Sequence, residues 1–275
     1  MIDYVVIGHI CADLQPDGST RLGGTALFAA LTAHCLGLRT AILTACAPDF
    51  DLSAIPEGVQ IFRQPSPETT IFENRYHADG RTQLLHARAE TIDLRYVPDA
   101  WLDAPIVHIA PITQEVPDTV AALFPQAQIG VTPQGWIRTV QPDKIVTTAP
   151  NDLLALPFTG VRIVILSEED VQSDEPLVEQ LAQRIPILVL TRAERGATVF
   201  VSGVPTDVAA FPAKVVDPTG AGDVFAAAFF MALQQGQLPV AAARWACAAA
   251  SYAIEGPGIS TLPTIRQVEE RFSRG

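Results

Sequence analysis

Short apolar runs rich in β-branched residues recur along the chain, and the stretches between them have the composition of helices. The runs are YVVIG (4–8), TAILTA (40–45), PIVHIA (105–110), AQIGV (127–131), KIVTTA (144–149), VRIVIL (161–166) and PILVL (186–190). Runs of this length that are apolar throughout are typical of parallel strands buried on both faces, with helical crossovers between them. The pattern predicts an α/β fold: a doubly wound, mainly parallel sheet with helices on both faces.

Residues 69–88, TTIFENRYHADGRTQLLHAR, break this rhythm. Two stretches of alternating polarity flank Asp79-Gly80, a dipeptide typical of a tight hairpin turn. The hairpin is either a plain edge hairpin or a lid that closes over a site. We expect a single α/β domain over residues 1–275 with a small lid formed by about 69–88, and residues 12–22 are a second candidate lid segment. Exposed lid strands could also pair across a homodimer.

Charge and composition narrow the classes of partner. Eighteen basic and thirty acidic residues give a net charge of −12, without a basic cluster suited to a phosphate backbone, so no nucleic-acid partner is expected. The apolar runs at 224–233 and 240–254 are shorter than the roughly 18 residues of a membrane span, so no membrane partner is expected either.

The first residues, MIDYVVIG, look like a strand and not a leader, which predicts a cytoplasmic protein. The four cysteines are widely spaced, and we expect reduced thiols in the core.

Polar residues follow several of the expected strands. Asp13 comes after the first strand, residues 167–170 (SEED) come after VRIVIL, and Thr191 and Gly196 come after PILVL. Because open parallel sheets bind ligands beyond the carboxyl ends of their strands, these residues are candidate site residues. Any one of them, taken alone, is explained equally well as an ordinary polar strand end.

The stretch 214–229, KVVDPTGAGDVFAAAF, carries the strongest chemical signal. After an expected strand end at Val216, Gly220 and Gly222 would let backbone N–H groups converge at the first turn of an apolar helix, where unpaired amides attract anions. A carboxylate beside that anion, Asp223, makes sense as a base that takes the proton of an attacking hydroxyl. The alternative is a tight turn with a helix-terminal carboxylate worth about 0.3 to 1 kcal/mol.

The run at 217–223, DPTGAGD, resembles the second signature of the ribokinase-like (PfkB) carbohydrate kinase family, D-[TP]-[TN]-G-A-G-D. This resemblance implies that Asp223 is the catalytic base and that an anion hole for the transferred phosphate precedes it. The implied anion-hole amides are those of Gly220, Ala221 and Gly222. On the nucleotide side, the resemblance implies roles for Asp217 and Thr219.

The resemblance extends along most of the chain. Gly23 and Gly24, which open the stretch TALFAALTAHCLG, are similar to the family's glycine pair beside the acceptor, and Asp13 matches the carboxylate that holds sugar hydroxyls. His9 is a further candidate for the acceptor pocket because it follows the first strand near Asp13. The segments VTPQGWIR (131–138) and EGPGIS (255–260) also fit. On the nucleotide side the resemblance implies Thr191, Gly196 and Gly256.

The sequence departs from the family's motifs in three places, where the acceptor specificity and the metal geometry are set. Phe28 replaces an Asn that many members place four residues after the glycine pair. The N-x-x-E metal motif reads SEED (167–170), so the implied Mg²⁺ role falls on Asp170, with Glu168 as a second candidate. The T-x-G-x-x-G loop reads TRAERG (191–196) and has lost one glycine.

The sequence thus predicts an ATP-dependent, Mg²⁺-using kinase that moves the γ-phosphoryl group to a hydroxyl of a small sugar, polyol or nucleoside. Two alternatives remain open at this point. One is a kinase of a small heterocyclic alcohol, such as a vitamin precursor, against which the lid-like hairpin argues. The other is a non-catalytic nucleotide- or sugar-binding protein, which the altered metal motif makes conceivable.

Overall fold

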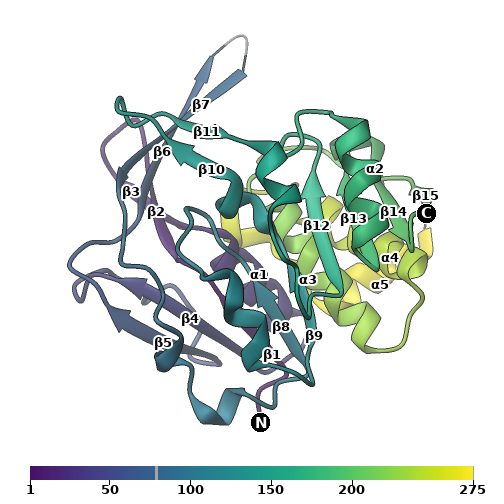
Figure 1. Ribbon diagram of the computed structural model, residues 1–275, viewed down its shortest axis with the longest axis horizontal. Helices are drawn as coiled ribbons and strands as arrows, with labels where there is room; N and C mark the ends of the chain where they lie inside the picture. The colour runs from purple at the N-terminus through teal and green to yellow at the C-terminus, as the bar shows by residue number, and fades with distance from the viewer. Residues whose placement is uncertain (78–79, 275) are drawn as a thin grey trace.

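The computed structural model describes residues 1–77 and 80–274, and a large sheet forms its centre (Figure 1). The sheet contains β1 (Tyr4–Ile7), β4 (Thr40–Cys46), β5 (Val59–Pro65), β8 (Ile106–Ile109), β9 (Gln128–Val131), β12 (Ile163–Ser167), β13 (Ile187–Thr191), β14 (Ala197–Val201) and β15 (Val204–Val208). Their order is β15-β14-β13-β12-β9-β8-β1-β4-β5. Neighbours from β5 to β13 pair in parallel, and β14 and β15 add an antiparallel edge. The predicted mainly parallel sheet is confirmed.

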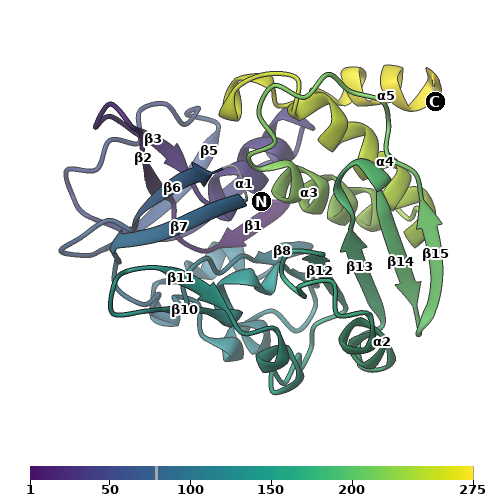
Figure 2. The same cartoon turned by 90° about the horizontal axis from the view of Figure 1, so that it is seen from above.

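Helices lie on both faces of this sheet, as predicted. One face carries α1 (Thr25–Cys35), α3 (Ala221–Gln234), α4 (Pro239–Ala253) and α5 (Ile265–Arg274); the other carries α2 (Glu175–Arg184) and short 3-10 helices such as Asp118–Leu123 and Pro133–Ile137 (Figure 2). In β1, Tyr4 and Val6 pack into the core of the first face, while Val5 and Ile7 pack into the other. This double burial explains why the strands are apolar without alternation.

Helix α3 is fixed against the sheet by its apolar side chains, which are buried from Val224 to Ala232. Phe230 packs on β9 at Gly130, where a Cβ atom would lie 2.2 Å from the ring. The Phe230 ring also meets the His108 ring of β8 edge-on, at 5.0 Å between centroids. Glycine at position 130 is therefore required by close packing, and this packing sets where the first turn of α3 lies.

A smaller sheet stands beside the main one. It contains β2 (Cys11–Leu14), β3 (Thr20–Gly23), β6 (Ile71–His77) and β7 (Gly80–Ala87) in the order β3-β2-β6-β7. Strands β6 and β7 pair antiparallel, as the alternating pattern of 69–88 predicts, and β2 and β3 bring most of 12–22 into the same sheet. Of the predicted turn at Asp79-Gly80, Asp79 lies outside the described residues.

Two expectations about strands were wrong. KIVTTA does not join the parallel sheet: its strand β11 (Val146–Thr148) pairs antiparallel with β10 (Arg138–Val140). The two threonines make this run partly polar, and Thr147 shares a hydrogen bond of 2.8 Å with Thr139 across the hairpin. Val216 does not end a strand either, because it lies in the loop after β15, where its N–H donates to the Ile254 carbonyl at 2.8 Å.

Helix length and the cysteines were also predicted from the sequence. None of the helices in the described residues is long and apolar enough to cross a membrane. All four cysteines are free thiols; Cys11, Cys46 and Cys247 are buried, and Cys35 is partly buried.

Candidate active site

The turn before α3 brings glycines and a carboxylate together. Gly220 caps the helix in the left-handed conformation (φ 78°), and a Cβ atom there would lie 2.2 Å from the Phe28 ring of α1. At Gly222 a Cβ atom would meet nothing within 4 Å. The fold thus requires the glycine at 220 for backbone conformation and close packing, whereas the glycine at 222 leaves open space in front of the helix end.

Backbone donors at this turn are largely unused. Within the described part of the chain, the N–H groups of Gly220, Gly222 and Asp223 meet no protein acceptor, whereas the Ala221 N–H donates to the Pro218 carbonyl at 3.2 Å. The expected anion hole used the amides of Gly220, Ala221 and Gly222. In the structure, the free N–H donors are those of Gly220, Gly222 and Asp223. Three free N–H groups at a helix N-terminus form a ready anion site.

Asp223 lies in the first turn of α3 and differs from an ordinary surface carboxylate. Burial raises its pKa to about 7, against the opposing effects of the Thr25 side chain and the positive charge of Arg138; the nearby Asp170 charge raises it further. The side chain still keeps partial solvent exposure. A partly exposed carboxyl group whose pKa lies near neutral pH is suited to accept and release a proton.

The glycine pair sits against Asp13. A Cβ atom on Gly23 would lie 2.1 Å from Oδ2 of Asp13, and one on Gly24 (φ 97°) would lie 2.6 Å from the His9 carbonyl oxygen. Burial raises the pKa of Asp13 to about 6, while the charges of Arg81 and Arg138 oppose the shift. Asp13 and Asp223 both act electrostatically on the Cys11 thiol.

His9 does not reach this region as expected. Its side chain is fully buried, its Nδ1 shares a 2.8 Å hydrogen bond with Thr70 Oγ1, and its Nε2 shares one of 3.0 Å with the Glu90 carbonyl. Both ring nitrogens are therefore occupied inside the protein. The position after the first strand predicted the right neighbourhood, but the ring turns into the core and leaves no nitrogen for an acceptor.

Arg138 is a site residue that the sequence reasoning missed. Its Nη1 donates to the Ile112 carbonyl at 3.0 Å and its Nη2 to Gln134 Oε1 at 2.9 Å, while its guanidinium lies 5.8 Å from the centroid of the Phe72 ring. Gln134 in turn donates to Thr25 Oγ1 at 2.7 Å. The only sequence signal was an arginine at the end of VTPQGWIR, a segment noted without a role.

The charge of Arg138 faces acidic groups without pairing closely with any of them. It acts on Asp13, Asp170 and Asp223, yet among the described residues no carboxylate oxygen lies within 4.0 Å of it. Burial lowers the pKa of the guanidinium, which nevertheless stays protonated at neutral pH. A partly buried cation with spare N–H donors is suited to meet a bound anion or hydroxyl.

Asp217 and Thr219 tie the glycine turn to the segment after α4. Asp217 Oδ1 accepts from the Thr219 N–H at 2.9 Å, and Oδ2 accepts from the Gly258 N–H at 3.0 Å. Burial acts to raise the Asp217 pKa, but these hydrogen bonds outweigh it and the pKa is lowered. Gly256 lies in the same segment, and a Cβ atom there would lie 2.2 Å from Thr261 Cγ2. In the structure, these residues organise loops beside the turn.

The loop 191–196 contains two residues in the left-handed backbone region, only one of which is a glycine. Ala193 adopts φ 48° and Gly196 adopts φ 92°. Thr191, at the end of β13, donates through Oγ1 to the Leu166 carbonyl at 3.2 Å. An alanine in the left-handed region carries a cost of about 1 kcal/mol or more, so the surrounding contacts hold the loop in a shape that glycine would adopt freely.

The two candidate metal ligands behave differently. Glu168 Oε1 pairs with Arg195 and, at 2.7 Å, with Arg192, and these partners lower its pKa, so this oxygen is already bound to two cations. Asp170 Oδ2 accepts from the N–H and the hydroxyl of Ser167, both at 2.8 Å, and burial raises its pKa. Within residues 1–77 and 80–274, no three His, Cys, Asp or Glu side chains are grouped to hold a metal. Asp170 alone fits Mg²⁺ held mainly by waters and phosphates.

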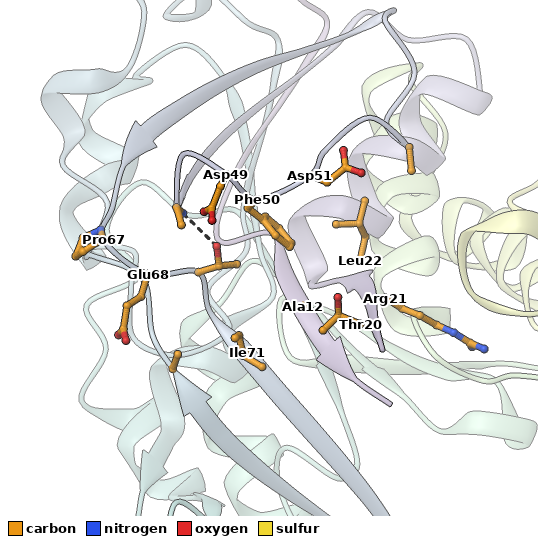
Figure 3. Close-up of a pocket in the computed structure, with 14 residues that line it drawn as sticks. Ala12, Thr20, Arg21, Leu22, Asp49, Phe50, Asp51, Pro67, Glu68 and Ile71 are labelled. Carbon is orange, nitrogen blue, oxygen red and sulfur yellow. Dashed lines mark hydrogen bonds between the residues drawn. The ribbon is translucent and has the colours of Figure 1, made fainter. Parts of the chain in front are cut away.

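A pocket of about 580 Å³ lies elsewhere, between the small sheet and the loop after β4 (Figure 3). The small-sheet residues Ala12, Leu22, Ile71 and Ala87 line it, and pairing places them on the opposite face from Asp13 and Phe72. In Figure 3, Arg21 extends away from Asp49, Phe50 and Asp51. None of the groups around Asp223 lines this pocket.

The known proteins to which this chain is similar are kinases. A model of the pfkB family carbohydrate kinases matches residues 149–265. A cytidine kinase from Thermococcus kodakarensis is 29% identical over 266 residues, covering 86% of this chain and 90% of that protein. The resemblance to the ribokinase-like (PfkB) carbohydrate kinases is therefore confirmed, and a phosphotransferase that acts on a hydroxyl group is supported.

Solved structures share the fold over almost the whole chain. A pyrophosphate-dependent kinase in the ribokinase family, complexed with a pyrophosphate analog and myo-inositol, aligns with a TM-score of 0.80 at 23% identity, covering 98% of this chain and 99% of that one. A ribokinase from Arabidopsis thaliana, complexed with ribose and ATP, aligns with a TM-score of 0.70 at 21% identity, covering 98% of each chain. At these identities the likeness shows the ribokinase-like fold alone.

Proposed function

We propose that this relative of the PfkB carbohydrate kinases transfers the γ-phosphoryl group of ATP to a hydroxyl of a nucleoside, sugar or polyol. The observation that carries the proposal is the first turn of α3, where a carboxyl group with a pKa of about 7 stands beside N–H groups that donate to no described protein group. A structural turn would use its donors internally and leave a surface carboxylate with an ordinary pKa. This arrangement matches what transfer to a hydroxyl requires.

In the proposed reaction, the ionised Asp223 accepts the proton of the acceptor hydroxyl. The resulting oxygen forms a bond to the γ-phosphorus while the bond to the leaving ADP oxygen breaks. The free N–H groups of Gly220 and Gly222 donate to the oxygens of the transferred phosphoryl group, whose charge is spread over those oxygens in the transition state. The open space at Gly222 allows the phosphoryl group to approach the helix end.

The acceptor is proposed to lie between the small sheet and the glycine pair. Asp13 would accept hydrogen bonds from acceptor hydroxyls, and Gly23 and Gly24 would let the acceptor approach the backbone. Phe28 is buried against Gly220, and its phenyl ring has no group that could form the hydrogen bond to a sugar hydroxyl that an asparagine would form. Nucleosides stand first among the acceptors because a relative that matches most of the chain is named a cytidine kinase.

On the donor side, Thr191, Gly196, Asp217, Thr219 and Gly256 are proposed to shape the nucleotide site. Mg²⁺ would be held by Asp170 through water and by the phosphates, where it would neutralise phosphate charge. ATP is the proposed donor. Pyrophosphate is the competitor to test, because a solved neighbour with the same fold is described as pyrophosphate-dependent.

The small sheet is proposed to act as a lid on the acceptor, within a single domain that spans the chain. Its face with Asp13 and Phe72 lies toward Arg138, so closure would shield the acceptor from water. A homodimer through this sheet would cover its other face, and light scattering across a concentration series would detect it. A mass that stays at 29.4 kDa would argue against that dimer.

Turnover with a matrix of donors and acceptors tests the proposed function. ATP and pyrophosphate would each be combined with cytidine, other nucleosides, ribose, myo-inositol and a small heterocyclic alcohol, and the phosphorylated product would be detected by mass spectrometry. The Asp223→Asn variant, purified in parallel, controls for contaminating kinases. We expect product with ATP and at least one nucleoside, sugar or polyol. Binding of these compounds without product would favour a non-catalytic binding protein.

A further inference from the structure

The small sheet is connected to the rest of the molecule by short segments that meet at His9. Two stretches of the chain, 11–23 and 71–87, supply its strands, and each stretch enters the sheet once and leaves it once. His9 lies two positions before the first stretch, and Gly24 follows it directly. Thr70 directly precedes the second stretch, and residues 88–90 follow it.

His9 contacts each of these connections. Its Nδ1 shares a hydrogen bond of 2.8 Å with Thr70 Oγ1, and its Nε2 shares one of 3.0 Å with the Glu90 carbonyl. The Ala89 N–H also donates to Thr70 Oγ1, at 3.0 Å. On the other connection, the Gly24 backbone packs so closely that a Cβ atom there would lie 2.6 Å from the His9 carbonyl oxygen. A single fully buried residue thus joins both stretches of the small sheet.

We propose that His9 and Thr70 are positioning residues: their contact fixes the small sheet against the main sheet and thereby holds Asp13 at the acceptor. The inference rests on the proposed function for the claim that the acceptor binds at Asp13. Its geometric part concerns the protein alone and can be tested without any substrate.

The direction of each hydrogen bond at His9 follows from chemistry. A carbonyl oxygen only accepts, so Nε2 of His9 carries the proton that faces Glu90. In the neutral ring, which burial favours by lowering the His9 pKa, Nδ1 then accepts the proton of the Thr70 hydroxyl. The oxygen of that hydroxyl remains available to the Ala89 N–H. Position 70 therefore needs a group that donates and accepts at once, which serine also has and valine lacks.

The backbone of His9 is anchored to the main body. The His9 N–H donates to Glu115 Oε1 at 3.1 Å, and the same oxygen of this fully buried side chain accepts from the Ile112 N–H at 2.9 Å, in the loop after β8. The next N–H, that of Ile10, donates to Thr44 Oγ1 of β4 at 2.8 Å. The backbone of His9 is therefore fixed to the main sheet, and its ring transmits that position to the small sheet.

Thr70 is also bonded to the strand that carries Asp13. The Ala12 N–H donates to the Thr70 carbonyl at 2.9 Å, and Asp13 is the next residue, paired with Phe72 of β6. A shift of Thr70 therefore moves β2 and β6 together, and the Asp13 carboxylate moves with them. A displacement of about 1 Å in a group that orients a substrate can cost on the order of a hundredfold in rate.

Hydrogen exchange on substrate-free protein tests the geometric part. Thr70→Val removes the hydroxyl while keeping the shape, and Thr70→Ser restores it. We expect amide exchange in β2 and β6 to become about tenfold faster in Thr70→Val and to return toward the wild-type rate in Thr70→Ser, while β12 and β13 keep their rates. His9→Gln keeps a donor for the Glu90 carbonyl but loses the acceptor for Thr70, so it should act in the same direction.

Thr32→Val is the matched control. Thr32 is fully buried, as Thr70 is, but its hydroxyl donates to the Phe28 carbonyl within α1 at 2.7 Å, so exchange in the small sheet should stay unchanged. Unchanged exchange in β2 and β6 in both Thr70→Val and His9→Gln overturns the proposal. Equal acceleration in every strand also overturns it, because the contact would then support overall stability only. If Thr70→Val fails to fold, His9→Gln decides by the same comparison.

Turnover separates this inference from the proposed function. If the acceptor binds at Asp13, Thr70→Val should raise its KM by about tenfold, leave the Kd of ATP unchanged and be rescued by Thr70→Ser. A merely structural defect would lower kcat through the fraction of folded enzyme and leave KM unchanged. Faster exchange in β2 and β6 with an unchanged KM would overturn acceptor binding at Asp13 but not the role of the contact in fixing the sheet. A raised KM with unchanged exchange would overturn that role.

Discussion

Two charged regions of the molecule are built in opposite ways. In the first, around Asp13, Asp170, Asp223 and Arg138, the charges influence one another, yet in the described part of the chain no ion pair within 4.0 Å joins them. The carboxyl pKa values there are raised. These four residues form the open cluster.

In the second region, at the ends of β12 and β13, the charged side chains form ion pairs with one another. Arg192 pairs at 2.7 Å with both Glu168 and Glu175, Arg195 pairs with Glu168, and the Glu168 pKa is lowered. These four residues form the paired cluster. Charge alone therefore does not mark a site: acids and bases that pair with one another stabilise loops, whereas those left unpaired are available to a ligand.

The largest effect is expected for Asp223→Asn in the open cluster. Loss of a general base should lower kcat by about 10²- to 10⁴-fold, with nucleotide binding largely preserved. Steady-state kinetics and calorimetric titration with nucleotide check the two parts. A variant that retains most of its turnover would remove Asp223 from the mechanism.

The same substitution should stabilise the fold at high pH. Because the native pKa of Asp223 is raised from 3.8 to about 7, the native state holds a proton that the unfolded chain has lost between those values. The stability from this proton is present below about pH 4 and is lost as pH rises through 7. Asparagine does not ionise, so the variant does not lose this stability as the pH rises. At pH 8 we expect its free energy of unfolding to exceed that of wild type by about 1 to 3 kcal/mol, and near pH 4 the difference should vanish. Equal gains at both pH values in urea unfolding would contradict the raised pKa.

Substitutions of the two glycines in the turn distinguish a role in stability from a role in binding the phosphoryl group. Gly222→Ala meets no protein atom, so its stability should be equal or higher by about 0.5 to 1 kcal/mol, as expected for alanine in a helix. Its turnover should fall at least about tenfold, because the methyl group enters the space proposed for the phosphoryl group. Unfolding curves and kcat/KM check both expectations.

Gly220→Ala is the matched structural variant. It places a Cβ atom against the Phe28 ring at a left-handed backbone position, and stability should fall by about 1 to 3 kcal/mol. A Gly222→Ala variant that is as active as wild type would show that the open space is not used by the phosphoryl group.

Metal dependence distinguishes the two clusters. Asp170→Asn, in the open cluster, should raise the Mg²⁺ concentration for half-maximal turnover several-fold, since Mg²⁺ is held through few protein carboxylates. Glu168→Gln, in the paired cluster, should leave that concentration unchanged and lower stability by about 1 kcal/mol or less, because these ion pairs are partly exposed. The reverse outcome would move the metal role to Glu168.

The smallest effect is expected at Ala193. Glycine suits its φ of 48° better than alanine does, so Ala193→Gly should change stability by less than about 1 kcal/mol, in the stabilising direction. Thermal unfolding checks the sign. A clear loss of stability would mean that the methyl group contributes packing that outweighs the backbone strain.

The sequence predicted the parts of the molecule that depend on local pattern. Apolar runs predicted most of the parallel strands and alternation predicted the β6–β7 hairpin, because each property is encoded within a few neighbouring residues. The glycines at the start of α3 predicted unused amides at 220 and 222, but the Ala221 N–H, expected in the same set, donates to the Pro218 carbonyl. KIVTTA was misassigned because a short run with two threonines has the same pattern on a two-stranded hairpin as in a sheet.

The missed features depend on contacts between distant segments. His9 was expected at the acceptor, but partners near residues 70 and 90 bind its ring. Arg138 and Gln134 reach Thr25 across more than one hundred positions of sequence, and no local motif encodes such a meeting. Likewise, Glu168 was expected at a metal because its pairing with Arg192 and Arg195 is visible only in the fold.

The pH dependence of kcat/KM for the wild-type enzyme tests the central claim most directly. If Asp223 must be ionised to accept the proton of the hydroxyl, kcat/KM should rise tenfold per pH unit on the acidic side and level off above an apparent pKa near 7, where Asp223 titrates. A kcat/KM that stays constant from pH 5 to pH 8 would contradict the claim that this carboxyl group is the base.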